Sequence, residues 1–372
     1  MSTIFDELGV KPVLNAMGNR TLLGGNTPSA EIRAMMDEAE EYYADMGELM
    51  DNVGDRIADM LGVEAALVTS GCAAALTVGA AACMTGQDID KIERIPDVTG
   101  LPHEVIIQRQ LRVRYDRTMS ASGGKLIEVG DEDGTRPEHI EEAIGPNTAA
   151  IHYLAPGDRN PGALPLEEVI RIGHAHDIPI IVDAAGQVYP TDLLSSYVKM
   201  GADLVAYGAK YFGSVNSSGI LTGRKDLIEA ARMNSFIGFE QSDISNFARP
   251  MKLDRQEVVA VYAALRAWLT MNHEDRFAAY EVRITTLHSD LSGLPNVTLT
   301  AHPSDGPMEG LQVTVDATAA GKTASDVVAE MRGGTPGIWV RHVEGEDFFV
   351  IRMPTLKEGG EKVIADRLKE IL

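Results

Sequence analysis

The fold is decided by the stretch Ala202-Asp-Leu-Val-Ala-Tyr-Gly-Ala-Lys-Tyr-Phe-Gly-Ser-Val-Asn-Ser-Ser-Gly-Ile-Leu-Thr-Gly223. Its apolar run from Leu204 to Ala206 predicts a buried strand, and Lys210 follows just beyond the carboxyl end of that strand. A lysine in the crevice beyond a parallel strand loses solvation energy unless it pairs or reacts, and a lowered pKa makes it a nucleophile for an aldehyde. A surface lysine in a turn explains the stretch equally well. The choice depends on whether the rest of the chain supplies partners for an aldehyde cofactor.

A second predicted strand ends in an acidic residue. Ile178-Pro-Ile-Ile-Val-Asp183 is a continuous apolar run of the kind that is buried on both faces of a parallel sheet. The interval from Asp183 to Lys210 accommodates one strand-helix-strand crossover, so both side chains can reach the same edge of the sheet. A buried carboxylate is costly unless it pairs with a cation, and a protonated pyridine nitrogen is such a cation.

A third predicted strand, residues 64–69, leads into a turn of small residues. Ser70 and Gly71 form the turn, and the alanine-rich segment from Cys72 predicts a helix that is buried on most faces. Free backbone N–H groups and the positive end of the helix dipole meet at such a turn, which makes it an anion site. We expect Ser70, Gly71 and Cys72 to hold a phosphate, although many α/β proteins use such a turn only to reverse the chain.

The composition excludes several classes of protein. The chain has 372 residues, 44% hydrophobic and 24% charged, which is enough for a large core and suggests two domains. A formal net charge of −22 opposes binding to nucleic acid or to an anionic membrane. Because no apolar run approaches a membrane span and the first six residues lack signal-peptide features, we expect a cytoplasmic protein. Cys72 and Cys83 lie too far apart on one helix for a disulfide, and the sequence predicts no metal site.

Three arginines are candidates for holding an anionic substrate. Arg109 follows the predicted strand 103–108 and opens a basic segment, which a solvated helix face explains equally well. Arg20 lies in residues 11–28, a glycine- and asparagine-rich segment that predicts a loop. Arg352 lies inside an apolar strand, where its guanidinium needs a carboxylate, either of the substrate or of the protein.

The pattern of elements predicts a three-part organisation. An N-terminal arm with helices covers residues 1–50, a large α/β domain covers 51–252, and 253–372 contain a long helix (253–291) and a small α+β domain. Within the last part, Gly321-Lys-Thr323 resembles a fragment of a nucleotide-binding loop. Asp316 stands where that loop requires a glycine, and its charge would repel phosphate. A capping box of Thr323 with Asp326 explains the fragment better.

The ordered set of these features matches the needs of pyridoxal phosphate (PLP). The turn at 70–72 would anchor the phosphate, Lys210 would bind the aldehyde as a Schiff base, and Asp183 would keep the pyridine nitrogen protonated. Each feature is weak evidence by itself. Their occurrence together, in this order along the chain, is strong evidence.

The chain resembles fold-type I PLP enzymes of the selenocysteine synthase-like group, which also includes D-glucosaminate-6-phosphate ammonia-lyase. The resemblance extends from the N-terminal loop to the C-terminal part. It rests on these segments: Pro12-Val-Leu-Asn-Ala-Met-Gly18, Leu23-Gly-Gly25, Ala65-Ala-Leu-Val-Thr-Ser-Gly71, His103-Glu-Val-Ile-Ile-Gln-Arg109, Ile180-Ile-Val-Asp-Ala-Ala-Gly-Gln187, Gly208-Ala-Lys210 and Arg249-Pro-Met-Lys252.

The resemblance implies a large, mostly parallel sheet domain with a smaller C-terminal α+β domain, as in aspartate aminotransferase-like folds. It implies that Lys210 is the Schiff-base lysine, that Asp183 is the pyridinium partner, and that residues 70–72 and Gln187 line the cofactor site. It also implies a homo-oligomer, a dimer or a multiple of dimers, with active sites at subunit boundaries.

Two departures from the group matter. Relatives often have Gly-His-Arg where this chain has Gln110, Leu111 and Arg112, so a histidine that stacks on the cofactor would need a replacement here. The chain begins almost directly at the Asn15 motif, without the extra domain that selenocysteine synthases use for tRNA. A small amino acid is therefore the expected substrate, and tRNA is not.

The expected reaction is an α,β-elimination on a small hydroxylated amino acid or amino sugar acid, which gives a 2-oxo acid. In this hypothesis Lys210 removes the α-proton, and Arg352, Arg109 or Arg20 holds the substrate anion. A racemase or epimerase shares the first steps, and a β-replacement enzyme like a selenium transferase is a further alternative. Two alternatives belong to other functional classes. One is a cofactor-binding regulatory protein without turnover, and the other is a nucleotide-binding protein that uses residues 316–323.

Overall fold

The computed structural model describes residues 4–304 and 306–372. The chain forms two compact units: one is Pro28–Thr270, and the other combines the segment up to Thr27 with Met271–Leu372. These limits differ from the expected boundaries at 50 and 252. Helix α2 (Ala30–Glu40) packs against α11 (Arg255–Thr270), so both belong to the unit that holds the parallel sheet.

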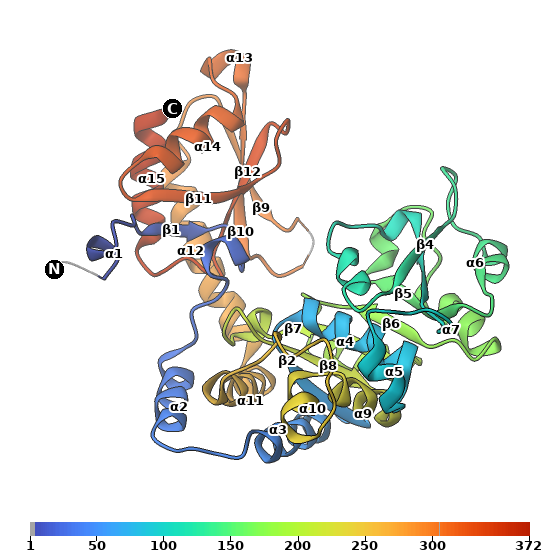
Figure 1. Ribbon diagram of the computed structural model, residues 1–372. Helices are drawn as coiled ribbons and strands as arrows, with labels where there is room; N and C mark the ends of the chain where they lie inside the picture. Colours follow the sequence, from blue (N-terminus) through green and yellow to red (C-terminus); the bar gives the residue numbers. More distant parts are fainter. Residues whose placement is uncertain (1–3, 305) are drawn as a thin grey trace. The chain divides into compact units, whose positions relative to one another are not determined.

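The larger unit is built on a seven-stranded sheet whose strand order is β2-β8-β7-β6-β5-β3-β4 (Figure 1). Strand β8 runs antiparallel to both of its neighbours, and the remaining pairs are parallel. The strands are β2 (Ala65–Thr69), β3 (Glu104–Gln108), β4 (Lys125–Val129), β5 (Thr148–Leu154), β6 (Ile180–Asp183), β7 (Leu204–Gly208) and β8 (Gly219–Gly223). The strands predicted at 64–69, 103–108, 178–183 and 204–206 are confirmed.

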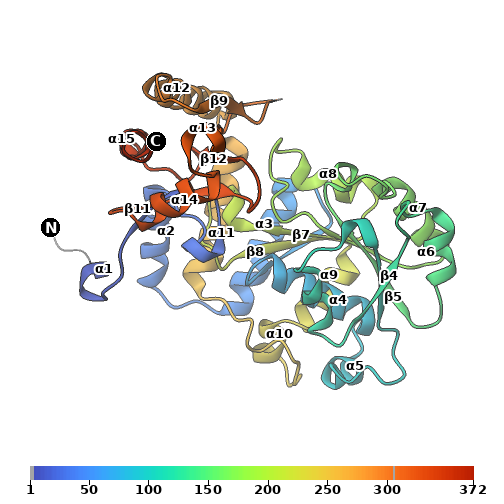
Figure 2. The ribbon, with the colours of Figure 1, turned by 90° about the horizontal axis from the view of Figure 1, so that it is seen from above.

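Helices cover both faces of this sheet (Figure 2). Helices α4 (Cys72–Thr85) and α9 (Lys225–Met233) pack on one face, and α7 (Leu166–Ala175) and α8 (Leu193–Met200) pack on the other. The other helices of this unit are α3 (Met46–Leu61), α5 (Ile89–Arg94), α6 (Pro137–Ala143) and α10 (Phe236–Gln241). Two covered faces explain why the central strands are continuous apolar runs and show no alternation.

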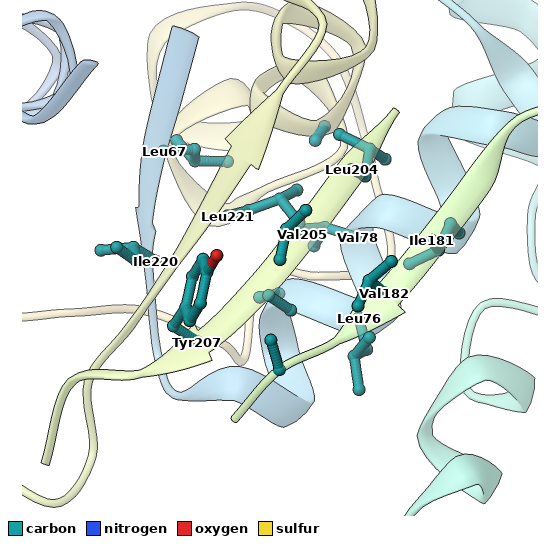
Figure 3. Close-up of a cluster of buried hydrophobic side chains, with 14 of the residues drawn as sticks. Leu67, Leu76, Val78, Ile181, Val182, Leu204, Val205, Tyr207, Ile220 and Leu221 are labelled. Atoms are coloured by element: carbon teal, nitrogen blue, oxygen red, sulfur yellow. The ribbon is translucent and has the colours of Figure 1, made fainter. Parts of the chain in front are cut away.

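The core lies between α4 and the centre of the sheet. Helix α4 is apolar on every side and almost entirely buried, as its alanine-rich sequence predicts. Its Gly79 packs near Leu204 and Leu221, and a Cβ there would lie 3.4 Å from Leu204 Cδ1. Figure 3 shows these two leucines among the buried side chains of β7 and β8.

The smaller unit contains a five-stranded sheet in the order β1-β11-β12-β10-β9. Strand β1 pairs parallel to β11, and the other pairs are antiparallel. The strands are β1 (Val13–Ala16), β9 (Val297–His302), β10 (Gly310–Val315), β11 (Gly337–His342) and β12 (Phe348–Arg352). The helices are α1 (Ile4–Glu7), α12 (His273–Leu291), α13 (Ala317–Ala320), α14 (Ala324–Gly333) and α15 (Gly360–Ile371). The C-terminal part of this unit combines strands and helices, and the N-terminal strand β1 joins its sheet.

Two sequence predictions were wrong. Residues 11–28 are not loop throughout, because Val13–Ala16 forms β1; its partner β11 lies far away in the sequence, and no local pattern shows that pairing. The helix predicted over 253–291 is two helices, α11 and α12. Asn272 caps the second helix, since its side chain accepts hydrogen bonds from the N–H groups of Glu274 and Asp275.

Some further expectations concern single side chains. The capping box of Thr323 and Asp326 is confirmed at the start of α14. Both cysteines are free thiols, as their spacing predicts. Within residues 4–304 and 306–372, no helix is long and apolar enough to cross a membrane, and no group of three His, Cys, Asp or Glu side chains could hold a metal ion.

Candidate active site

Three predicted site segments meet at one edge of the seven-stranded sheet. Strand β2 is antiparallel to β8, and β8 is antiparallel to β7, so β2, β6 and β7 all run in the same direction. Their carboxyl ends therefore point to the same edge, where the 70–72 turn, Asp183 and Lys210 follow directly. This is the edge at which ligands bind in open α/β sheets.

The turn after β2 has the geometry of an anion site. Gly71 precedes α4 with a φ of 94°, a conformation that side chains other than glycine rarely adopt. The N–H groups of Cys72 and Ala73 lie in the first turn of a 14-residue helix, where backbone donors have no intrahelical acceptor. The Gly71 N–H itself donates to Thr69 O at 2.8 Å, so its amide is already engaged.

Two other segments support this turn. The Ser70 hydroxyl donates to Met251 O at 3.0 Å, which ties the turn to the Arg249-Pro-Met-Lys252 segment. Gly219 of β8 lies directly beneath the turn: a Cβ there would lie 2.6 Å from the Gly71 carbonyl carbon and 2.7 Å from the Cys72 nitrogen. A side chain at 219 would therefore fill the space on which the turn rests.

Asp183 ends β6 and is almost fully buried. Its Oδ1 accepts hydrogen bonds from the Ala185 N–H at 3.0 Å and from the Cys72 thiol at 3.5 Å. Its Oδ2 accepts no hydrogen bond from residues 4–304 or 306–372. The carboxylate is thus held by one oxygen and presents the other to a ligand.

The Cys72 thiol joins the turn after β2 to the end of β6. Burial and the negative charge of Asp183 raise the pKa of Cys72 well above its usual value, while the nearby Lys210 charge opposes this shift. The thiol is therefore protonated at neutral pH and acts as a donor to Asp183. This agrees with a Cys72 that is packed and not nucleophilic.

Lys210 lies in a single 3-10 turn (Ala209–Phe212) that directly follows β7. The loop after it closes on itself, because the Ala209 N–H donates to Ser218 O and the Ser214 N–H donates to Ala209 O. The Lys210 Nζ lies 3.5 Å from Asn216 Oδ1 and 5.3 Å from the centre of the Tyr211 ring. The amine is half-buried and held within the loop that carries it.

Gln187 and Arg109 lie at the same edge of the sheet. Gln187 follows β6 in the loop 184–187, which a hydrogen bond from the Gln187 N–H to Ala184 O closes. Arg109 follows β3 and is exposed. The preceding residue, Gln108, is fully buried and forms two hydrogen bonds with the backbone of Leu164, which fixes the end of β3.

The two remaining arginines belong to the smaller unit. Arg352, at the end of β12, forms an ion pair with Glu309, so the carboxylate that its burial required is one of the protein's own. Its Nε is buried without a hydrogen-bond partner among the described residues. Arg20 is exposed in the segment after β1. The structure thus gives Arg352 a carboxylate partner within the protein.

The segment that departs from relatives has a structural role here. Leu111 is fully buried in the core. Gln110 donates to Asp131 O at 2.8 Å and accepts from the Thr135 hydroxyl at 2.7 Å, and Arg112 pairs with Asp116 at 2.6 Å. The side chains of Gln110 and Arg112 thus anchor the loops around β4.

Sequence reasoning missed four contacts of the site. Ala185 and Met251 act through backbone atoms, and Gly219 acts by lacking a side chain, so residue type alone did not reveal their roles. Asn216 lies six residues after Lys210 in the sequence. This spacing predicts a contact between the two side chains only if the loop is known to fold back.

The comparisons with known proteins agree with this geometry. Residues 28–288 match the family described as SelA, L-seryl-tRNA selenium transferase. The chain belongs to this family. It is 32% identical to 5'-C-glycyluridine monooxygenase-decarboxylase of Streptomyces sp over 99% of this chain and 92% of the relative. It is 27% identical to D-glucosaminate-6-phosphate ammonia lyase of Salmonella typhimurium over 99% of this chain and 97% of the relative.

Solved structures place the SelA-family chain in the expected fold class. A structure of D-glucosaminate-6-phosphate ammonia-lyase superposes with a TM-score of 0.87 at 27% identity, over 100% of this chain and 98% of that one. A PLP-bound serine palmitoyltransferase from S. paucimobilis, 14% identical, has a TM-score of 0.57 over 97% of this chain and 87% of that one, and shares the fold. The predictions of fold-type I and of the selenocysteine synthase-like group are confirmed.

We predict that Gly219→Ala weakens the binding of PLP, the cofactor expected from the sequence, about 5- to 100-fold. The added Cβ must displace the 70–72 turn, and overpacking of this kind costs about 1–3 kcal/mol. Titration of the apoprotein with PLP, followed by absorbance, measures the change. Gly145→Ala is the matched control, since a Cβ at 145 meets no atom within 4 Å. Equal affinity of the two variants would show that the turn does not hold the cofactor.

Proposed function

We propose that this protein is a PLP-dependent lyase. It removes the α-proton and the β-hydroxyl of a small hydroxylated amino acid or amino sugar acid and releases ammonia and a 2-oxo acid. The observation that carries the proposal is the contact of Cys72 with Asp183, which joins the anion-binding turn to a buried carboxylate at the edge where Lys210 follows β7. The similarity to an ammonia lyase over nearly the whole chain supports the reaction class.

The residues at this edge fit PLP. The first-turn amides of Cys72 and Ala73 suit its phosphate, and the open Oδ2 of Asp183 suits the N–H of its ring. Lys210 suits its aldehyde, because its amine is half-buried and held in place near Asn216. When bound there, PLP supplies an electron-accepting ring that stabilises negative charge on the α-carbon of the substrate.

The residues of the chain then have distinct tasks. Asp183 keeps the ring nitrogen protonated, and its hydrogen bonds from Ala185 and Cys72 hold the carboxylate in position. With PLP bound, the Lys210 amine would act as the general base that removes the α-proton. The resulting Lys210 ammonium would give this proton to the β-hydroxyl, which would leave as water, and hydrolysis of the released product would give ammonia and the 2-oxo acid.

The substrate anion needs a cationic partner, and Arg109 is one candidate. It is exposed, lies at the same edge of the sheet as Lys210, and can bind a carboxylate or a phosphate in bidentate geometry. Arg352 and Arg20 stay predictions for the same role. For Arg352, the pairing with Glu309 means that a substrate anion would share or displace that carboxylate.

We predict that the purified protein, loaded with PLP, has a visible absorption band that borohydride converts to a stable covalent adduct. Lys210→Ala is expected to lose both the band and the adduct, because no other amine would hold the aldehyde. Mass spectrometry of a proteolytic digest locates the adduct. Lys225→Ala removes an exposed lysine outside the site and is the matched control, which should still form the adduct at Lys210. Absence of any band after incubation with PLP would overturn the enzyme assignment and favour the reading without turnover.

A second candidate function has its own support. The relative at 32% identity is described as a monooxygenase-decarboxylase, so the same site could serve loss of carbon dioxide with consumption of oxygen. Both reactions break one bond at the α-carbon. The choice depends on which bond the substrate presents perpendicular to the plane of the ring, and not on Lys210 or Asp183.

We predict that hydroxylated amino acids and phosphorylated amino sugar acids release ammonia and a 2-oxo acid in equal amounts without oxygen uptake. An oxygen electrode, an ammonia assay and a 2-oxo acid assay on the same samples measure this. Lys210→Ala is the inactive control. Oxygen uptake with release of carbon dioxide from a glycyl-nucleoside would favour the second candidate. Exchange of the α-proton with solvent without ammonia release would favour a racemase, and product formed only with an added selenium or sulfur nucleophile would favour β-replacement.

We also infer that the protein is a homo-oligomer. Helix α1 buries none of its residues, and Ile4, Phe5 and Leu8 expose 59%, 48% and 65% of their surface. Contiguous apolar side chains of this kind are typical of an association surface. Light scattering is expected to give at least twice the chain mass of 40.1 kDa, and Phe5→Ser with Leu8→Ser should shift the mass downward. A wild-type mass of 40.1 kDa would contradict this inference.

A further inference from the structure

His152 is a buried titratable residue for which the proposed reaction has no use. It lies in the middle of β5, none of its surface is exposed, and neither ring nitrogen has a hydrogen-bond partner among the described residues. A neutral imidazole carries one donor and one acceptor, and burying both without hydrogen-bond partners is unfavourable because each loses its hydrogen bonds to water. So unfavourable an arrangement calls for a partner.

The sheet register places His152 close to Asp183. On the neighbouring strand β6, His152 is paired with Ile181 and Leu154 is paired with Asp183. Paired residues of a parallel sheet, and residues two apart on one strand, point to the same face, so His152 and Asp183 share a face. Strand spacing and rise put their Cα atoms about 8 Å apart. The ring and the carboxylate form no direct hydrogen bond, and two polar groups that are near each other without a direct hydrogen bond can be bridged by one water molecule.

The hydrogen bonds of Asp183 leave room for such a water. Oδ1 already accepts from the Ala185 N–H and the Cys72 thiol, which uses its two lone pairs. Oδ2 has two lone pairs, one of which suits the ring N–H of the proposed cofactor. The second can accept from a water, which can in turn accept from the His152 N–H.

Burial favours the neutral form of His152. Burial lowers its pKa from the ordinary value of 6.5, and Arg112 lowers it further, whereas Asp183 and Asp116 act in the opposite direction. A neutral ring can donate from one nitrogen and accept at the other. A second buried atom without a partner among the described residues, the Thr118 hydroxyl oxygen, lies in the 3-10 turn Asp116–Ser120. Both this turn and β5 pack against α4.

We propose that His152 is a positioning residue that holds Asp183, through one buried water, in the orientation and ionised state that the ring nitrogen of the cofactor requires. The inference rests on the proposed function. In this arrangement His152 supports Oδ2 of Asp183 through the water, whereas the Ala185 N–H and the Cys72 thiol donate only to Oδ1. Removal of His152 would leave Oδ2 with the cofactor as its sole partner, and the carboxylate would become easier to protonate and to rotate.

A double-mutant cycle separates this role from general packing. The four proteins are the wild type, His152→Leu, Asp183→Asn and the double variant, and the measured quantities are the PLP dissociation constant and the visible spectrum as a function of pH. In the wild-type background, His152→Leu is expected to weaken PLP binding about tenfold or more and to shift the pH at which the spectrum changes. In the Asp183→Asn background, the same change is expected to have little effect.

Two further variants control for shape. His152→Phe keeps a planar ring without a donor and should resemble His152→Leu; it replaces that variant if the latter does not fold. His152→Gln keeps an N–H near the position of the ring nitrogen and is expected to restore most of the affinity. Equal losses in the wild-type and Asp183→Asn backgrounds, or no recovery with glutamine, would overturn the proposal and assign His152 a packing role.

A high-resolution crystal structure of the wild-type holoenzyme gives an independent test. Electron density for one water molecule between His152 and Asp183 Oδ2 is expected. If no water lies between these two side chains, the proposal is overturned, even if none of the variants folds. The outcomes also distinguish the two levels of inference. If the wild type binds no PLP, the proposed function fails. If it binds PLP but the cycle shows no coupling, only the role of His152 fails.

Discussion

The site depends on a buried carboxylate that must stay charged. Asp183 closes a strand enclosed by helices on both faces of the sheet, where an unpaired negative charge costs several kcal/mol. The protein offsets only part of this cost, with an amide and a weak thiol donor on one oxygen. The other oxygen, Oδ2, still needs a cation or a hydrogen-bond donor. That imbalance supports the proposal that a protonated ring nitrogen binds at this edge of the sheet.

The same constraint explains the small residues nearby. The Cys72 thiol reaches Asp183 only because α4 begins immediately after the turn, and the turn rests on Gly219 without an intervening side chain. Farther along α4, Gly79 packs near Leu204 and Leu221. The packing of one helix thus places its N-terminus next to the buried carboxylate of Asp183. This arrangement supports the proposal that one ligand contacts both.

Members of one family are described with different reactions. The relatives include an ammonia lyase, a monooxygenase-decarboxylase and selenium transferases, so membership of the family does not by itself fix the reaction. The segment Gln110 to Arg112 is used for packing and for anchoring loops. The choice of reaction therefore belongs to the proposed function and is decided by the assays of ammonia, 2-oxo acid and oxygen.

The amino-acid sequence alone is enough to predict the parallel strands, the order of the turns that follow them, and the candidate residues Lys210, Asp183 and 70–72. Apolar runs, helix caps and small-residue turns are local signals, and the order of the three segments along the chain is readable without a structure. Only the tertiary structure decided that β1 joins a distant sheet, that Glu309 pairs with Arg352, and that His152 is buried beside Asp183 without a partner among the described residues. These facts depend on contacts between residues that lie far apart in the chain. Strand pairing and the burial of charged side chains arise only when the chain packs, so no local or periodic pattern in the sequence predicts them.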